Sequence, residues 1–428
     1  MVDGKPMNRW LVVLGAILIQ LSLGAIYAWS AFTTALTDAP YNFTKTQTQW
    51  IFGVGLATFA VVMVVAGRMQ SRIAPRQLAA LGGIVLGLGY AAARFAGTSF
   101  WGHLIAIGLV GGAGIGLAYV VPIAVGVKWF PDKKGMLTGL AVAGFGFGAL
   151  IWIKLAGSWG HLIDQLGVAN VFLAYGAAFA LLVLIGSIWM VNPPEGYRPA
   201  GWQPPAPTGG AAATGALNLG SAEMLATPQF YMLWLMFIAG AMAGLMVIGC
   251  ISLFANEALQ SRGLSADAAK AAAGTAWGVF GALANGLGRI IWGMVSDRLG
   301  RKFSLFLMLA LQGVVMLLFY QMGFRTGLLY LGAAIIGFNF GGNFALFPAA
   351  TADFFGNKTV GANYGWVFTA YGVGGIVGPY LGGLFGDMAK TSGQISSWAT
   401  PFTIAGIACL VAAVLALLLR PPKHMAAH

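Results

Sequence analysis

Two charged side chains fall inside long apolar stretches of this sequence, and they decide what chemistry the chain could perform. Lys154 lies about one helical turn from the end of its stretch, so its ammonium group can reach the surface along its own alkyl chain. Arg289 lies deeper, two turns before Asp297. A guanidinium group stays charged and matches a carboxylate through two parallel hydrogen bonds. Arg289 therefore predicts a site for an anion, with a cation that reaches the surface as the alternative.

Polar and aromatic residues that could complete such a site occur in several apolar stretches. Asn285 lies one helical turn before Arg289, and Tyr119 and Tyr371 carry phenol groups. These three side chains could hydrogen-bond a 2-hydroxyl or 2-keto oxygen next to a carboxylate. An apolar wall for a methyl group could come from Phe340, Phe344 and Phe368. Packing against lipid or against other helices is the alternative for each aromatic residue.

The composition requires lipid around the chain. Hydrophobic residues make up 59% and charged residues 8%, with a mean hydropathy of +0.81, whereas a soluble domain carries about 25% charged residues. A helix that rises about 1.5 Å per residue needs about 20 apolar residues to cross a membrane. Such runs occur at 10–34, 47–67, 77–96, 101–128, 136–159, 168–191, 230–255, 268–294, 303–322, 327–351, 361–386 and 397–420. The predicted fold is therefore an all-α membrane protein with twelve transmembrane helices.

The second half of the chain repeats the pattern of the first. Gly67 and Arg72 recur 226 residues later as Gly293 and Arg298. The same offset relates Gly116, Pro122, Gly135, Gly139 and Gly146 to Gly342, Pro348, Gly361, Gly365 and Gly372. A parallel repeat in a membrane protein indicates two helical bundles with a site between them. We expect one six-helix bundle over 1–191, a Pro- and Gly-rich linker over 192–228 and a second six-helix bundle over 229–428.

The positive charges predict the orientation. Lys and Arg residues are more frequent in the even-numbered loops, the linker and both chain ends than in the odd-numbered loops. Because the basic side faces the cytoplasm, both termini are expected on the cytoplasmic side of the plasma (inner) membrane. The net charge of +12 is scattered over short loops, so no nucleic-acid partner is expected. Cys250 and Cys409 lie in predicted spans without metal-ligand spacing, and neither a metal nor a cofactor is expected.

The loop after the eighth span, GMVSDRLGRK, resembles the loop signature of the major facilitator superfamily. It contains Gly293, Asp297, Arg298 and Arg301, and its first-half copy GRMQSRIAPR has Ser71 where the signature has Asp. Gly permits close helix packing, and the charges could pair with helix ends, so the loop could act as a conformational latch between the bundles. A basic loop that only sets topology is the alternative.

Other motifs indicate a narrower branch. AEMLATPQFYMLW, WFPDKKGMLTGLAVAGFGFGAL, LFPAATADFFG and NYGWVFTAYGVGGIVGP resemble the bacterial oxalate/formate antiporters, which are related to the proton-coupled monocarboxylate transporters. The resemblance implies that Arg289 binds the substrate. By this resemblance, the antiporters have a Lys at the position where this chain has Tyr371. The animal transporters have an Asp at the position where this chain has Asn285. With one cation in the cavity, a monoanion is neutralised, whereas a dianion would keep an unpaired carboxylate.

We therefore expect a secondary active transporter of small monocarboxylates, such as lactate or pyruvate, that works as a monomer by proton-coupled symport. The proton could travel on the substrate carboxyl, through water, or on Glu257 or Asp353. Carboxylate exchange is the alternative, because an empty carrier should resist closing over an unpaired Arg289. An enzyme is disfavoured because no acid–base pair or metal cluster occurs in the spans. A channel would need a continuous polar ring.

Overall fold

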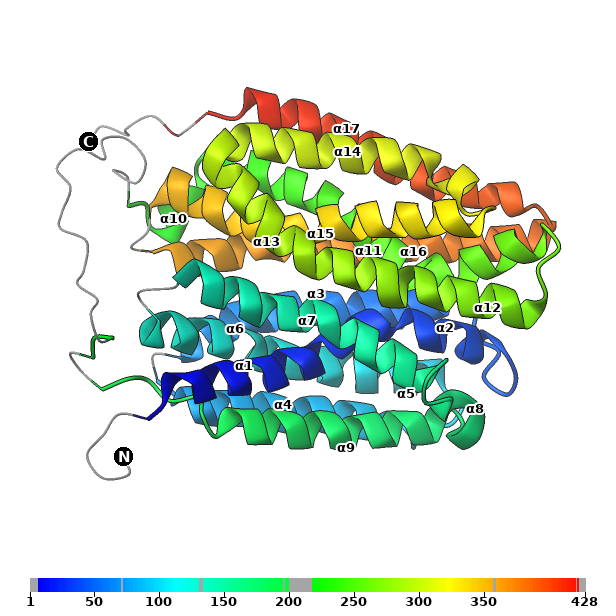
Figure 1. Ribbon diagram of the computed structural model, residues 1–428, viewed down its shortest axis with the longest axis horizontal. Coiled ribbons are helices and arrows are strands. Elements are labelled where there is room, and N and C mark those ends of the chain that lie inside the picture. The colour runs from blue at the N-terminus through cyan, green and yellow to red at the C-terminus, as the bar shows by residue number, and fades with distance from the viewer. Residues whose placement is uncertain are drawn as a thin grey trace.

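The structure is a computed structural model that describes residues 7–70, 72–130, 134–194, 197–199, 218–356, 359–420 and 422. Ser71 and most of the predicted linker lie outside the described residues. Two groups of helices lie side by side with their long axes roughly aligned (Figure 1). Helix α1 begins and α17 ends at the same end of the molecule, which we call the terminal end. The opposite end is the far end.

Long helices form the amino-terminal bundle. Its described elements are α1 (Arg9–Leu23), a 3₁₀ turn (Gly24–Ala28), α2 (Ser30–Thr37), α3 (Lys45–Met69), α4 (Pro75–Ala93), α5 (Phe100–His103), a π-helical segment (Leu104–Gly111), α6 (Gly112–Trp129), α7 (Lys134–Ala156), α8 (Leu162–Leu166) and α9 (Val168–Ser187). The turn at Gly24–Ala28 interrupts the first predicted span. Tyr27 in this turn has no exposed surface.

The carboxyl-terminal bundle repeats this plan. Its described elements are α10 (Ser221–Leu225), α11 (Pro228–Gln260), α12 (Ala266–Thr275), a π-helical segment (Ala276–Gly281), α13 (Ala282–Leu299), α14 (Arg301–Met322), α15 (Thr326–Phe355), α16 (Val360–Ser392), a 3₁₀ turn (Ile395–Trp398) and α17 (Ala399–Leu418). Among the described residues, eleven helical stretches are long and apolar enough to cross a membrane. The remaining predicted span corresponds to α7, in which Ala143–Ala156 is a further apolar helical stretch. The prediction of an all-α membrane fold with about twelve spans is confirmed.

Local sequence explains where several helices begin and end. Thr44 and Gln47 form a capping box at the start of α3, in which each side chain bonds the other's backbone N–H. The Thr227 side chain caps α11 by accepting from the Phe230 N–H. Gly300 follows α13 with a φ of 81°, a conformation that costs glycine little. The sharp turn between α13 and α14 therefore depends on that glycine.

Packing follows the sequence repeat. In the first half α3 packs on α6, and in the second half α13 packs on α15. A Cβ on Gly116 would lie 2.8 Å from the Phe59 carbonyl oxygen, and one on its repeat partner Gly342 would lie 2.6 Å from the Trp292 ring. Both glycines are thus required by a neighbouring helix at equivalent places. The two halves share one internal design, as the constant offset predicts.

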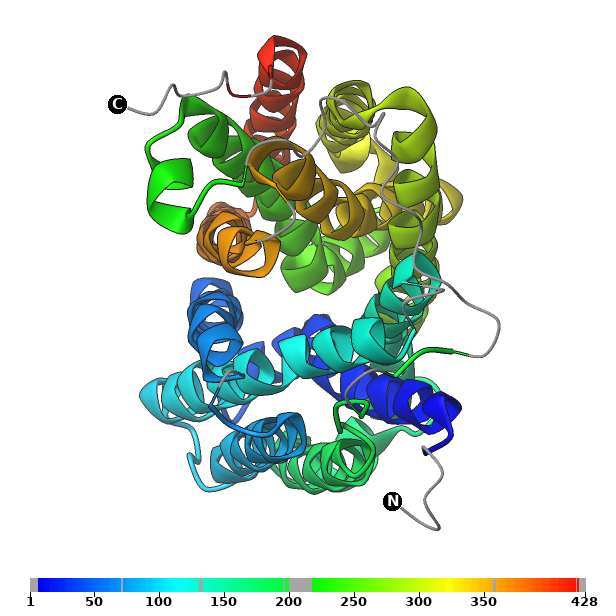
Figure 2. The ribbon, with the colours of Figure 1, turned by 90° about the vertical axis from the view of Figure 1, so that its left-hand side faces the viewer.

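The bundles meet along two pairs of helices, α3 with α16 and α7 with α13. Seen from the terminal end, these pairs face each other across the boundary (Figure 2). Small residues allow the approach: a Cβ on Gly53 would lie 2.8 Å from the Gly375 carbonyl oxygen. A Cβ on Gly146 of α7 would lie 3.4 Å from the Gly286 nitrogen of α13. This contact brings the buried face of α13 to the boundary between the bundles.

Candidate functional site

Arg289 and Asn285 share the buried face of α13, and the arginine is only 4% exposed. Arg289 Nε donates a hydrogen bond of 3.2 Å to Asn285 Oδ1, which fixes the direction of the guanidinium. Within the described residues, neither Nη1 nor Nη2 of Arg289 has a hydrogen-bond partner, and Asn285 Nδ2 has none either. Such groups are costly to leave unsatisfied. Nη1 and Nη2 of Arg289 and Nδ2 of Asn285 thus form a cluster of hydrogen-bond donors suited to an anion.

Aromatic rings surround this cluster. The Arg289 guanidinium carbon lies 4.1 Å from the centre of the Phe344 ring and 5.9 Å from that of Phe145. Phe344 in turn contacts the rings of Phe340 and Tyr371 at 5.3 Å and 5.7 Å between centroids. A cation over a ring face is attracted by the ring's electron density. The rings also exclude water, which strengthens any charge pairing at Arg289.

A hydrogen bond between two phenols joins the bundles at this level. Tyr27 Oη lies 2.8 Å from Tyr371 Oη, and both rings are fully buried. The Tyr27 ring also contacts Phe340 at 5.5 Å and Phe145 at 5.0 Å between centroids. Tyr27 therefore lies where helices from both halves converge.

The remaining sequence-predicted residues contact the same rings. We call Arg289, Asn285 and the aromatic residues around them the aromatic layer. Phe368 stacks on Tyr371 at 4.8 Å and on Tyr119 at 6.2 Å between centroids. The phenols of Tyr27 and Tyr119 lie close to the Arg289 guanidinium and offer it neutral oxygen acceptors, although neither meets the geometry of a hydrogen bond to Nη1 or Nη2. The structure thus brings together all seven predicted binding residues: Asn285, Arg289, Tyr119, Tyr371, Phe340, Phe344 and Phe368. Their role in binding stays a prediction.

Sequence reasoning missed Tyr27, Phe59 and Phe145 as members of this layer. Phe59 contacts both Tyr119 and Tyr371, at 5.0 Å and 5.7 Å between centroids. None of the three carries a charge, so none was distinguishable from ordinary packing residues in an apolar stretch. The sequence feature nearest to Tyr27 is the GAIYAW segment. Its Gly24 packs against the backbone of Phe145.

The predicted latch forms an ionic network at the terminal end of the second bundle. Arg301 donates from Nη1 to Asp297 and from Nε to Asp353, both at 2.8 Å. Arg298 is exposed, and a Cβ on Gly293 would find its nearest neighbour at 3.8 Å, an ordinary contact distance. These described contacts join α13, α14 and α15 of one bundle. A role in holding the two bundles together stays a prediction.

A second ionic network, which the sequence did not reveal, does join the bundles at the far end. Lys45 Nζ of α3 bonds the Glu257 carboxylate of α11, and Trp398 Nε1 donates to the other Glu257 oxygen at 2.8 Å. The Asp387 carboxylate of α16 accepts from the backbone N–H of Lys45 at 2.8 Å. We call Lys45, Glu257, Asp387 and Trp398 the far-end clasp. Lys45 is 5% exposed, although it lies at the start of α3, before the apolar run that begins at residue 47.

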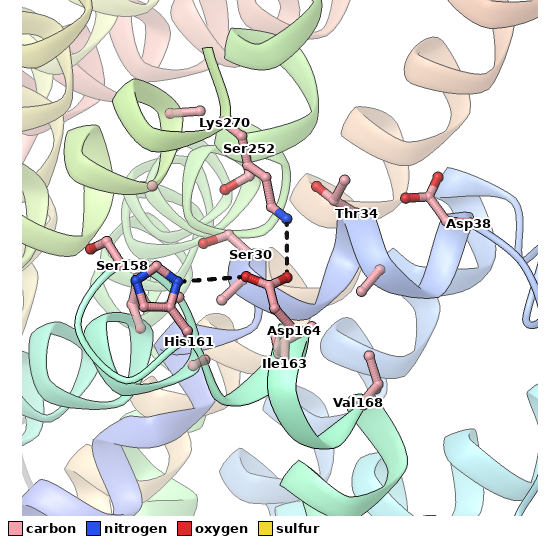
Figure 3. A pocket seen from close by; sticks show the side chains of 18 of the residues that line it. Ser30, Thr34, Asp38, Ser158, His161, Ile163, Asp164, Val168, Ser252 and Lys270 are labelled. Carbon is pink, nitrogen blue, oxygen red and sulfur yellow. Dashed lines mark ion pairs between the residues drawn. The ribbon is translucent and has the colours of Figure 1, made fainter. Parts of the chain in front are cut away.

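Near the clasp, a cavity of about 680 Å³ opens between α2, α7, α8, α11 and α12 (Figure 3). Figure 3 shows Lys270 and His161 directed toward the Asp164 carboxylate, at 3.7 Å in each case. No group of three or more His, Cys, Asp or Glu residues that could hold a metal occurs in the part of the chain that the structure describes.

The fold and the buried site define a multi-pass membrane transporter built from two bundles. The sequence model of the Major Facilitator Superfamily matches residues 12–285 and 261–428. The chain belongs to this superfamily. A solved structure of a bacterial homolog of the human lysosomal transporter Spinster matches with a TM-score of 0.67 at 15% identity, over 96% of both chains.

Three relatives extend the comparison. The uncharacterized MFS-type transporter YhjX of Escherichia coli (strain K12) is 30% identical over 86% of each chain. The oxalate:formate antiporter of Oxalobacter formigenes is 28% identical over 98% of this chain and 94% of its own. The apicoplast pyruvate carrier 1 of Toxoplasma gondii is 24% identical over 95% of this chain and 89% of its own. The branch to which the motifs pointed is confirmed.

Proposed function

We propose that this transporter carries small monocarboxylates of the lactate and pyruvate type by alternating access, with the substrate carboxylate bound by Arg289. The observation that carries the proposal is the buried guanidinium whose Nη1 and Nη2 lack partners among the described residues. A carboxylate would accept both bonds in bidentate geometry and neutralise the charge. Asn285 Nδ2, also unpartnered, is a further donor for a 2-hydroxyl or 2-keto oxygen.

The valence of the substrate follows from the charges of the layer. Arg289 is the only cation among the described residues that we find in the aromatic layer, and the Tyr371 phenol stands where the resembling antiporters have a Lys. A second carboxylate would therefore lie against aromatic rings without a counter-ion, at a cost of several kcal/mol. The pyruvate carrier among the relatives supports a monocarboxylate, and the oxalate:formate antiporter supports a carboxylate in general.

For coupling we propose proton symport, with exchange as the second candidate. Glu257 and Asp353, the two acids considered from sequence as proton carriers, are both ion-paired, with Lys45 and Arg301. Glu257 contacts α3 of the opposite bundle, so protonating it would change a contact between the bundles. Exchange is favoured by the Arg289 guanidinium, whose Nη1 and Nη2 lack partners among the described residues, because an empty carrier would have to close over this charge.

We further propose that the terminal end faces the cytoplasm, because the more basic loops lie there. The boundaries 1–191, 192–228 and 229–428 for the two bundles and the linker, a location in the plasma membrane and a monomeric functional unit belong to the same proposal. Labelling of single cysteines introduced into the linker, in intact cells and in inverted vesicles, tests the orientation. Labelling of the linker in intact cells would contradict it.

The experiment that tests substrate and coupling together is uptake of labelled lactate, pyruvate, acetate, formate and oxalate into proteoliposomes, with and without an imposed pH gradient. We expect uptake of the monocarboxylates, accelerated by an inward proton gradient. Uptake that depends on internal carboxylate and ignores the gradient would establish exchange. Uptake of oxalate alone would refute the monocarboxylate assignment.

A further inference from the structure

The far-end cavity contains a buried cation of its own. Lys154 of α7 lines the cavity and is 7% exposed. Its Nζ donates to Ser158 Oγ at 3.2 Å and to Thr275 Oγ1 at 3.3 Å. These partners are neutral hydroxyls, and no ion pair of Lys154 with a described residue is found. A buried ammonium bound only to hydroxyls retains an uncompensated charge.

The acids of the cavity do not supply that charge. Asp164 is paired with Lys270 across the bundles at 3.7 Å, with both side chains more than half exposed. Asp38 and Asp267 are exposed residues of the cavity lining. The acids thus meet solvent, whereas Lys154 is buried. An anion that enters the cavity therefore finds its counter-ion at Lys154.

The cavity also has the right place in a transport route. It is lined by α2, α7 and α8 of one bundle and by α11 and α12 of the other. Gly146 of α7 contacts α13 beside Asn285, and Lys154 follows it by two helical turns, about 12 Å at 1.5 Å per residue. Lys154 and the Arg289 site therefore lie at different levels along the bundle boundary. An anion moving along the bundle boundary would meet them in succession.

We propose that the far-end cavity is a second, vestibular binding site for a carboxylate monoanion, with Lys154 as its counter-ion and the hydroxyls of Ser158 and Thr275 as further hydrogen-bonding groups. This inference rests on the proposed carboxylate specificity of the transporter. The site would concentrate the anion at the far end before it reaches Arg289. Binding there does not require the bundles to change conformation.

Thiol labelling tests the site without relying on transport. Ala271 lines the cavity, is exposed and lies one helical turn from Thr275, whereas Cys250 and Cys409 are buried. In purified Ala271→Cys protein that also carries Arg289→Ala, sodium lactate should slow labelling by a polar maleimide relative to sodium chloride at equal ionic strength. Lactate at twice its dissociation constant should slow it about three-fold.

Adding Lys154→Gln should abolish the protection, and Lys154→Arg should retain it. Lys390→Gln, which removes an exposed far-end cation outside the cavity lining, is the matched control and should leave the protection unchanged. Absence of protection in the Arg289→Ala background, or its persistence in Lys154→Gln, would overturn the proposal. Protection by oxalate but not by lactate would also overturn it. Failure of wild-type uptake would refute the transport proposal separately, since labelling needs no transport.

Discussion

Arg289 and Lys45 are both buried cations at the boundary between the bundles, but their surroundings differ. Lys45 is 5% exposed and bonds the Glu257 carboxylate at the far end. Arg289 is 4% exposed, and the described groups around it are the Asn285 amide, the phenols of Tyr27 and Tyr119 and aromatic rings, none of which carries a negative charge. A charge with an internal partner is compensated in the empty protein. A charge without one leaves a place for a partner that comes from outside.

The comparison assigns different tasks to the two regions. The far-end clasp compensates its own charges, so its removal should change stability and the balance between conformations more than substrate recognition. The Arg289 layer contains no acid among the described residues that could replace a ligand, so its alteration should change recognition more than stability. The following variants test this division.

The largest effect is expected for Arg289. Arg289→Ala removes the counter-ion, and Arg289→Lys keeps a charge but cannot form two parallel hydrogen bonds to one carboxylate. Both variants should lose more than about 100-fold of lactate uptake into proteoliposomes, equivalent to about 3 kcal/mol, while retaining a normal elution profile and helical circular dichroism. Near-normal uptake by either variant would show that Arg289 does not bind the substrate carboxylate.

Tyr371→Lys should change the preferred valence of the substrate. The new ammonium would lie one aromatic ring away from Arg289, since Phe344 contacts both residues. Monocarboxylate binding should weaken and oxalate binding should strengthen, by about 1–3 kcal/mol or roughly five- to 150-fold in relative affinity. Competition of labelled lactate uptake by oxalate measures the shift. An unchanged inhibition ratio in a folded variant would show that charge count does not set valence here.

Breaking the far-end clasp should reduce stability. Glu257→Leu leaves the Lys45 ammonium buried without its acid. Because the Glu257 side chain is 35% exposed, we expect a loss of about 1–2 kcal/mol, less than for a fully buried pair. Thermal unfolding in detergent measures it, with the exposed acid changed in Asp267→Asn as control. The double variant Lys45→Met/Glu257→Leu should recover part of the loss, and a single variant as stable as wild type would contradict this role.

Tyr27→Phe should have the smallest effect. It removes one hydroxyl from the 2.8 Å bond to Tyr371 and leaves the ring contacts in place. The KM for lactate uptake should rise about five-fold, equivalent to about 1 kcal/mol for one hydrogen bond. Tyr231→Phe, at an exposed position, is the control. A KM equal to that of wild type would show that the phenol pair is only a packing feature.

The fold was largely predictable because its signals are local or periodic. Apolar runs of about 20 residues require membrane helices, and the recurrence of Gly116 as Gly342 indicates two related bundles whose packing the structure confirms. Helix boundaries were less predictable. Helix α11 continues to Gln260, five residues past the predicted span, and its last turn carries Glu257 of the far-end clasp.

The site was predictable where a buried charge or a motif of the resembling family pointed to a residue, as with Arg289 and Tyr371. Arg289 and Asn285 are one helical turn apart, so their hydrogen bond follows from helix geometry. Tyr27 and Lys45 were missed because their partners lie 344 and 212 residues away in the chain. Such pairings depend on how the two bundles pack against each other, which no local sequence pattern predicts.

Counterflow tests the central claim, a carrier with a carboxylate site at Arg289, most directly. Proteoliposomes preloaded with unlabelled lactate are diluted into a trace of labelled lactate, with wild type, Arg289→Lys and protein-free vesicles compared side by side. The account predicts a transient accumulation of label inside wild-type vesicles and none in the other two. Wild-type vesicles without accumulation, or Arg289→Lys vesicles that accumulate label like wild type, would contradict it.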